Sequence, residues 1–112
     1  RKAFGQELSR FQHIRFELAE VATKIQVTQS FIDDLIPRQM QGEELTREVS
    51  MAKYWASDVE FEVCDRCLQL FGGYGYMSEY PISRYFLDAR VQRIYGGTNE
   101  IMKELIARQL GI

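Results

Sequence analysis

Two long runs of apolar residues at helical spacing limit most strongly what this chain can fold into. In the first run, steps of three, four and seven connect Phe4, Leu8, Phe11, Ile14, Leu18, Val21, Ile25, Ile32 and Leu35. In the second, steps of three and four connect Leu45, Val49, Ala52, Ala56, Val59, Val63, Cys67 and Leu70. Residues with this spacing share one face of an α-helix, so the pattern predicts helices over about 2–36 and about 46–71.

Proline, glycine and threonine indicate where these two helices end and begin. Pro37 lacks a backbone donor and is expected to kink or end the first helix, and Gly42 offers a stop. Thr46 is the predicted N-cap of the second helix, with Glu48 in the first turn. Two long helices joined by so short a loop normally fold back antiparallel.

Two glycine-rich segments divide the remainder of the chain. The segment 72–76 ends the second helix, and a short helix is predicted over about 81–90. Gly96-Gly97 breaks the chain again, and Thr98 is the predicted cap of a last helix. No segment alternates as a strand does, so the predicted fold class is all-α, an antiparallel helical bundle.

Both long helices carry large apolar side chains outside their main stripe. These are Phe16, Val27, Phe31, Tyr54, Trp55 and Phe61. Helices that are apolar over so wide an arc need neighbours on more than one side. Because the chain begins with Arg1 rather than methionine, we expect it to be a fragment, 1–112 forming one helical domain of a longer protein. We expect another part of that protein, or a second subunit, to cover this surface.

Charge and cysteine content exclude several classes of function. The net charge of −2 gives no reason to expect a nucleic acid or an anionic membrane as partner, and no apolar run is long enough for a membrane span. Cys64 and Cys67 form a C-x-x-C, a spacing found in redox pairs and in half of a zinc site. Zinc needs two more ligands and the chain offers only His13, so we predict two reduced cysteines and no metal site.

The segments 69–75 and 95–100 combine glycines with a helix end, which lets backbone approach a ligand closely. A helix that begins near Thr98 directs unpaired N–H groups toward Gly96 and Gly97, an arrangement that favours a phosphate or a developing oxyanion. The alternative is that the glycines and the threonine only end and cap helices. Neither segment matches a P-loop or a dinucleotide-binding fingerprint.

Several motifs, in order along the chain, carry a resemblance to a known family. They are Arg1-Lys2-Ala3-Phe4-Gly5 followed by Gln12, then 69–76, Glu79-Tyr80-Pro81, Asp88-Ala89-Arg90 and 94–101. The chain resembles, over essentially its whole length, the C-terminal domain of acyl-CoA dehydrogenases. The run 95–108 is similar to that of the long-chain members in particular.

The resemblance implies a four-helix bundle that here lacks its first helix, within a tetrameric enzyme. That enzyme oxidises an acyl-CoA to the trans-2-enoyl-CoA with FAD, passes electrons to an electron-transfer flavoprotein, and resides in the mitochondrial matrix or the bacterial cytoplasm. By position, the expected FAD contacts are Arg1, Gln12, Gln69, Leu70, Phe71, Gly72, Gly73, Thr98, Asn99 and Glu100. The residues expected to contact the acyl-CoA are Tyr95, Gly96 and Gly97.

Three roles follow from the same resemblance. Arg1 is expected at the FAD pyrophosphate, and Gln12 with 69–73 at the nucleotide end, largely of an adjacent subunit's FAD. Residues 98–100 are expected at the flavin. The N–H group of Gly96 is expected to donate to the thioester oxygen.

One departure concerns the catalytic base. In many members of the family the base is a glutamate at the position of Gly96, which glycine cannot replace. In long-chain members it comes from the preceding helix, so we expect no catalytic residue in this chain and a base upstream of Arg1. Glu100 is the nearest carboxylate, at a flavin-contact position. Two alternatives remain: a sister flavoenzyme on the same fold, such as an acyl-CoA oxidase or a flavin monooxygenase, and a non-catalytic helical module.

Overall fold

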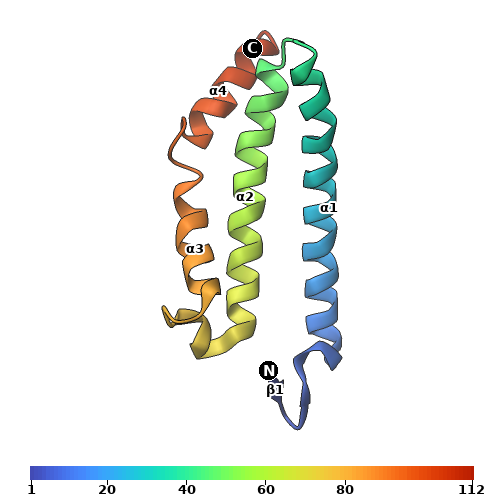
Figure 1. Cartoon of the computed structure of the whole chain (residues 1–112), viewed down its shortest axis with the longest axis vertical. Coiled ribbons are helices and arrows are strands. Elements are labelled where there is room, and N and C mark those ends of the chain that lie inside the picture. The colour runs from blue at the N-terminus through green and yellow to red at the C-terminus, as the bar shows by residue number, and fades with distance from the viewer.

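The chain forms four α-helices preceded by a short hairpin, and the computed structural model describes all 112 residues (Figure 1). The hairpin consists of strands β1 (Lys2–Ala3) and β2 (Gln6–Glu7). The 3-10 turn η1 (Leu8–Arg10) follows it. The elements that follow are α1 (Gln12–Met40), α2 (Thr46–Phe71), the 3-10 segment η2 (Gly72–Tyr76), α3 (Pro81–Val91) and α4 (Asn99–Gln109). The predicted all-α fold is confirmed.

Helix α2 is the centre of the molecule and packs against each of the other three helices. Helix α1 runs antiparallel to it on one side, while α3 and α4 follow one another along its other side (Figure 1). The result is an elongated body with extents of 56 × 27 × 25 Å. The antiparallel return predicted for the two long helices is confirmed.

The predicted start of the first helix is wrong. Phe4 and Gly5 have positive φ values of 52° and 81°, so the chain turns there and pairs β1 with β2, and α1 begins only at Gln12. Phe4 is 95% exposed, although its position fits the helical spacing. The helical spacing of apolar residues therefore continues by chance into this segment. Gly5 allows a turn here that an α-helix cannot contain.

The loop between the long helices differs in two details from the prediction. Pro37 lies inside the last turn of α1, and the helix ends at Met40, before Gly42 with its φ of 82°. Thr46 is the first helical residue of α2 rather than its N-cap. The Glu44 carboxylate accepts hydrogen bonds from the Thr46 hydroxyl and from its N–H group (3.0 Å), which lowers the pKa of Glu44. A glutamate two residues earlier therefore satisfies a donor at the start of α2.

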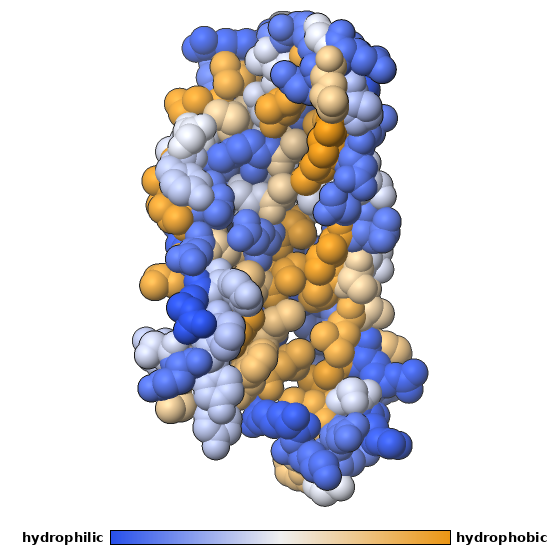
Figure 2. Space-filling view, viewed as in Figure 1, coloured by the Kyte–Doolittle hydropathy of each residue, from blue (hydrophilic) through white to orange (hydrophobic).

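The apolar core is small, and much apolar surface is open. The buried apolar residues are Val21, Leu35, Leu45, Val59 and Ala89. Figure 2 shows apolar side chains gathered in a band along the seam beside α1. Among the side chains predicted to need a cover, Phe16, Val27 and Trp55 are 59%, 58% and 45% exposed, whereas the ring of Phe61 packs on that of Phe86 with centroids 5.3 Å apart.

Charged side chains join α1 to α2 beside this seam. The Arg66 guanidinium donates from Nε to Glu17 (2.9 Å) and from Nη2 to Glu20 (2.6 Å), and Lys24 donates to Glu62 (2.8 Å). The hydrogen bond from Arg66 holds the pKa of the Glu17 carboxyl below its usual range. These pairs fix the register of α1 against α2 where few apolar contacts are buried.

The lowered pKa of Glu17 predicts a pH-dependent stability contribution. Because the unfolded chain binds the proton more readily, this contribution is present above the ordinary glutamate pKa of about 4.3 and is lost as the pH falls through the lower folded value. We expect Arg66→Met to lower the melting temperature at pH 7, and the difference from wild type to shrink toward pH 3. Arg15→Met is the control, since Arg15 is exposed and forms no ion pair. An equal loss from both variants at pH 7 would contradict the prediction.

Candidate functional site

The expected site residues fall into two clusters that lie at different heights along α2. Arg1 with 69–73, here called the terminal cluster, lies at the C-terminal end of α2. Residues 95–100, the loop cluster, lie against the middle of α2, where Asn99 contacts Ser57 and Asp58. A helix rises about 1.5 Å per residue, so roughly 20 Å of α2 separates the two clusters.

In the terminal cluster, Arg1 lies directly on the end of α2. Its Nη1 donates to the carbonyl oxygen of Leu70 at 3.0 Å. The guanidinium covers Gly72, where an added Cβ would lie 2.8 Å from Nη1. Gly72 also has a φ of 61°, which L side chains rarely adopt. The backbone conformation therefore requires glycine here, and a Cβ at this position would also displace the Arg1 guanidinium.

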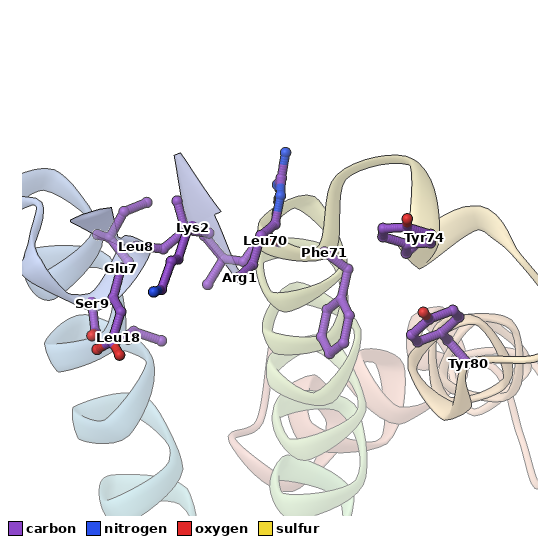
Figure 3. A pocket seen from close by; sticks show the side chains of 11 residues that line it. Arg1, Lys2, Glu7, Leu8, Ser9, Leu18, Leu70, Phe71, Tyr74 and Tyr80 are labelled. Carbon is purple, nitrogen blue, oxygen red and sulfur yellow. Dashed lines mark hydrogen bonds between the residues drawn. The ribbon is translucent and has the colours of Figure 1, made fainter. Parts of the chain in front are cut away.

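A cavity of about 650 Å³ opens beside this cluster (Figure 3). Figure 3 shows side chains from the N-terminal segment on one side of it and Phe71, Tyr74 and Tyr80 on the other. The rings of Tyr74 and Tyr80 pack with centroids 5.3 Å apart. A guanidinium beside apolar and aromatic walls suits a ligand that joins a phosphate to a planar ring. The residues present therefore fit the nucleotide portion of FAD.

Not every residue expected at the nucleotide end lines this cavity. Leu70 and Phe71 line it, whereas Gln69 lies beside a second cavity of about 430 Å³ that Arg1 and His13 share. Gln12 is exposed at the start of α1 and lines neither cavity. The structure thus groups Arg1 with 69–73 and leaves Gln12 apart from them.

The loop cluster offers backbone donors with no partner in the chain. The N–H groups of Gly96, Gly97, Thr98 and Glu100 donate to no other group, while the side chain of Thr98 accepts from the N–H of Ile101 (3.3 Å). The predicted N-cap role of Thr98 is therefore confirmed. Unpaired N–H groups at the start of a helix favour an anion or a developing oxyanion. Space is also available, because no atom lies within 4 Å of a Cβ built on Gly96.

Asn99 behaves differently from its neighbours because its side chain points into the chain. It is 4% exposed, and its Nδ2 donates to Ser57 Oγ (2.9 Å) and Asp58 Oδ1 (2.9 Å). Its Oδ1 accepts from Lys53 Nζ (2.8 Å), which also donates to the carbonyl oxygen of Gly97 (2.6 Å). These α2 residues were not predicted, because positions 53, 57 and 58 lie beside the apolar stripe of that helix and do not interrupt it.

The other candidate chemistries gain no support. Cys64 and Cys67 are free thiols, and burial raises the pKa of the Cys64 thiol, which makes it less reactive. No group of three or more His, Cys, Asp or Glu side chains is arranged to hold a metal ion. None of the helices combines the length and the apolar character that crossing a membrane requires.

Comparison with known proteins identifies the family. The family model "Acyl-CoA dehydrogenase, C-terminal domain" matches residues 1–111. The chain is 52% identical to the mitochondrial long-chain specific acyl-CoA dehydrogenase of Rattus norvegicus, over 98% of this chain and 26% of that protein. It is 36% identical to the caffeyl-CoA reductase–Etf complex subunit CarC of Acetobacterium woodii, over 98% of this chain and 29% of that protein.

A solved structure agrees with this result. The acyl-CoA dehydrogenase of Geobacillus kaustophilus superposes with a TM-score of 0.97 at 48% identity, covering 100% of this chain and 30% of that one. The chain thus spans about a quarter of the length of the rat relative. With the family model, these matches show that the chain belongs to the acyl-CoA dehydrogenase family.

Proposed function

We propose that this chain serves as the C-terminal helical domain of an FAD-dependent acyl-CoA dehydrogenase that forms trans-2-enoyl-CoA products. The observation that carries the proposal is the loop cluster: in a member of this family, the N–H groups of Gly96, Gly97, Thr98 and Glu100 are unpaired at the start of α4. Such donors stabilise the negative charge that develops on a thioester oxygen as the α-proton leaves.

The terminal cluster supplies the proposed contacts for the cofactor. Arg1 pairs with the pyrophosphate, for which its planar guanidinium is suited, and 69–73 line the nucleotide end together with Gln12. We propose that this FAD belongs largely to an adjacent subunit of a tetramer. FAD supplies the acceptor for the hydride that leaves the β-carbon of the substrate. Thr98, Asn99 and Glu100 are proposed to lie at the flavin.

Tyr95, Gly96 and Gly97 are proposed to face the acyl-CoA. The N–H group of Gly96 donates to the thioester oxygen, which orients the substrate and acidifies its α-proton. Gly96 has no side chain to accept that proton, so we propose a carboxylate base from a part of the full-length protein outside 1–112. Glu100 is exposed and close in sequence, but we assign it to flavin contact.

If Glu100 contacts the flavin and is not the base, replacing its carboxylate with the amide of glutamine should lower the reaction rate only slightly. Removing a general base costs about 10²–10⁴-fold in rate, whereas a flavin-contacting carboxylate is not consumed in proton transfer. We therefore expect Glu100→Gln in the full-length enzyme to reduce the rate of anaerobic flavin reduction by less than about 10-fold. A loss above about 100-fold, with FAD still bound, would identify Glu100 as the base instead.

The proposed acyl-CoA substrate and the proposed electron acceptor are inferred from the relatives of this chain. The identity of 52% with a long-chain specific enzyme supports a long-chain acyl-CoA, while the caffeyl-CoA relative shows how far the acyl group varies within the family. An electron-transfer flavoprotein is the proposed electron acceptor, in the mitochondrial matrix or the bacterial cytoplasm. If the full-length protein instead reduces oxygen rapidly after flavin reduction, it is an oxidase on the same fold.

The test is an anaerobic titration of the full-length protein with palmitoyl-CoA, monitored by the visible absorbance of the flavin. Bleaching at stoichiometric substrate is expected and would establish bound FAD, dehydrogenation and a long-chain substrate together. A yellow protein that bleaches only with other acyl-CoA esters would correct the chain length. A colourless protein that cannot be reconstituted with FAD would overturn the proposal.

A further inference from the structure

Four polar side chains attach the loop cluster to α2, and we call them the loop clamp: Lys53, Asp58, Arg93 and Asn99. Arg93 Nε pairs with Asp58 Oδ1 at 2.9 Å, just before the loop cluster. Within the cluster, Asn99 Nδ2 donates to the same Asp58 oxygen at 2.9 Å. Lys53 donates to Asn99 Oδ1 at 2.8 Å. The Asp58 carboxylate thus joins Arg93 to the neutral amide of Asn99, and the Lys53 ammonium donates to two neutral oxygens, those of Asn99 and Gly97.

The loop clamp contacts both ends of the segment 93–99, which has few interactions of its own to fix its conformation. The N–H group of Asn99 donates to the carbonyl oxygen of Arg93 at 3.1 Å, which closes the segment into a loop. Within it, Gly96 and Gly97 have positive φ values of 67° and 93° and no side chains to pack. Glycine is conformationally permissive, so the loop keeps one shape only if its neighbours impose it.

Lys53 is the clamp residue that contacts this glycine backbone directly. Its Nζ lies 2.6 Å from the carbonyl oxygen of Gly97. In a planar trans peptide the carbonyl oxygen and the following N–H point in opposite directions. Because Lys53 holds the Gly97 oxygen toward α2, the unpaired N–H of Thr98 points away from α2. The direction of the Thr98 N–H group thus depends on one ammonium group.

We propose that Lys53 is a positioning residue for acyl-CoA oxidation, which acts by fixing the Gly97–Thr98 peptide plane among the N–H groups of the loop cluster. The inference rests on the proposed function, in which these N–H groups meet the thioester and the flavin. Lys53 itself touches neither ligand. A donor aimed at charge that develops during the reaction matters more in the transition state than in substrate binding, so loss of the contact from Lys53 lowers kcat more than it raises KM.

The test compares wild type with Lys53→Met in the full-length FAD-loaded enzyme. Methionine keeps most of the length of lysine and removes both hydrogen bonds. With the acyl-CoA that reduces the wild-type flavin, we expect kcat for flavin reduction to fall by about 10- to 100-fold while KM changes less than about 3-fold. FAD content and the visible flavin spectrum should stay those of wild type.

Lys103→Met is the matched control because Lys103 also lies beside α2, with its ammonium 5.2 Å from the Tyr54 ring, but its ammonium donates no hydrogen bond to the loop cluster. It should keep the wild-type kcat. Lys53→Arg, which retains charge and two donors, should recover most of the activity. An unchanged kcat in Lys53→Met, a parallel loss of FAD and kcat, or no recovery in Lys53→Arg would each overturn the inference. A wild-type enzyme that no acyl-CoA reduces would overturn the proposed function instead.

Discussion

Gly72→Ala is expected to destabilise the full-length protein by about 2 kcal/mol and to weaken FAD binding about 10-fold. The first effect follows from the backbone, because Gly72 has φ 61° and ψ −140°, a region that costs other residues about 1–3 kcal/mol. The second follows from the side chain of Arg1, since the new methyl group would lie within 2.9 Å of its guanidinium carbon. The flexible arginine moves away and leaves the position proposed for the pyrophosphate.

Thermal unfolding and FAD titration of the apoprotein separate these two effects. Gly73→Ala is the stability control, because Gly73 lacks a positive φ and no atom lies within 4 Å of an added Cβ. We expect Gly73→Ala to be neutral or to stabilise the protein by up to about 1 kcal/mol. Equal destabilisation by the two alanines would show that the conformation at Gly72 is not the cause.

How far the sequence predicted the fold depended on which interactions determine each element. The bounds of α2 follow from local chemistry, an apolar stripe that ends at a glycine, and they were predicted. The N-cap at Thr98 is local as well and was also predicted. The start of α1 was not predicted, because spacing records where apolar residues stand and carries no information on the turn at Phe4-Gly5.

The candidate site divides in the same way. Glycine and threonine at the start of a helix indicated the unpaired N–H groups of the loop cluster, which the structure contains. The loop clamp could not be predicted, since Lys53 and Asn99 are 46 residues apart and meet only through the packing of α4 on α2. The ligand roles assigned to Arg1, Gln12 and the two clusters rest on resemblance and stay predictions.

Asn99 illustrates this difference between a residue that contacts a ligand and one that holds the site. The family resemblance implies a contact between Asn99 and the flavin, yet Asn99 is 4% exposed and its amide is bonded to Lys53, Ser57 and Asp58. Any contribution of its side chain to flavin chemistry therefore acts through the shape of the loop. Substituting it should accordingly affect folding as well as turnover.

We expect Asn99→Leu to cost about 3–5 kcal/mol of unfolding free energy, the largest effect of any single substitution considered. Leucine has a similar volume but no polar atoms, so Ser57, Asp58 and Lys53 each lose one hydrogen bond to Asn99, although Ser57 still donates to the carbonyl oxygen of Lys53 and Lys53 to that of Gly97. Each hydrogen bond lost costs about 0.5–1.5 kcal/mol, or about 1.5–3 kcal/mol where the partner is charged, as Asp58 and Lys53 are. Urea unfolding of the full-length protein, with the loss of bound FAD followed in parallel, measures the change.

Glu100→Leu provides the control for this prediction, because Glu100 is the next residue of α4, is exposed, and makes no side-chain hydrogen bond or ion pair. Within the chain, its carboxylate interacts only with the dipole at the start of α4, a contribution of about 0.3–1 kcal/mol. A cost several times larger for Asn99→Leu than for Glu100→Leu is therefore expected. Similar costs for the two variants would show that the buried amide stabilises α4 no more than an exposed neighbour does, and would remove the basis for treating Asn99 as the anchor of the loop.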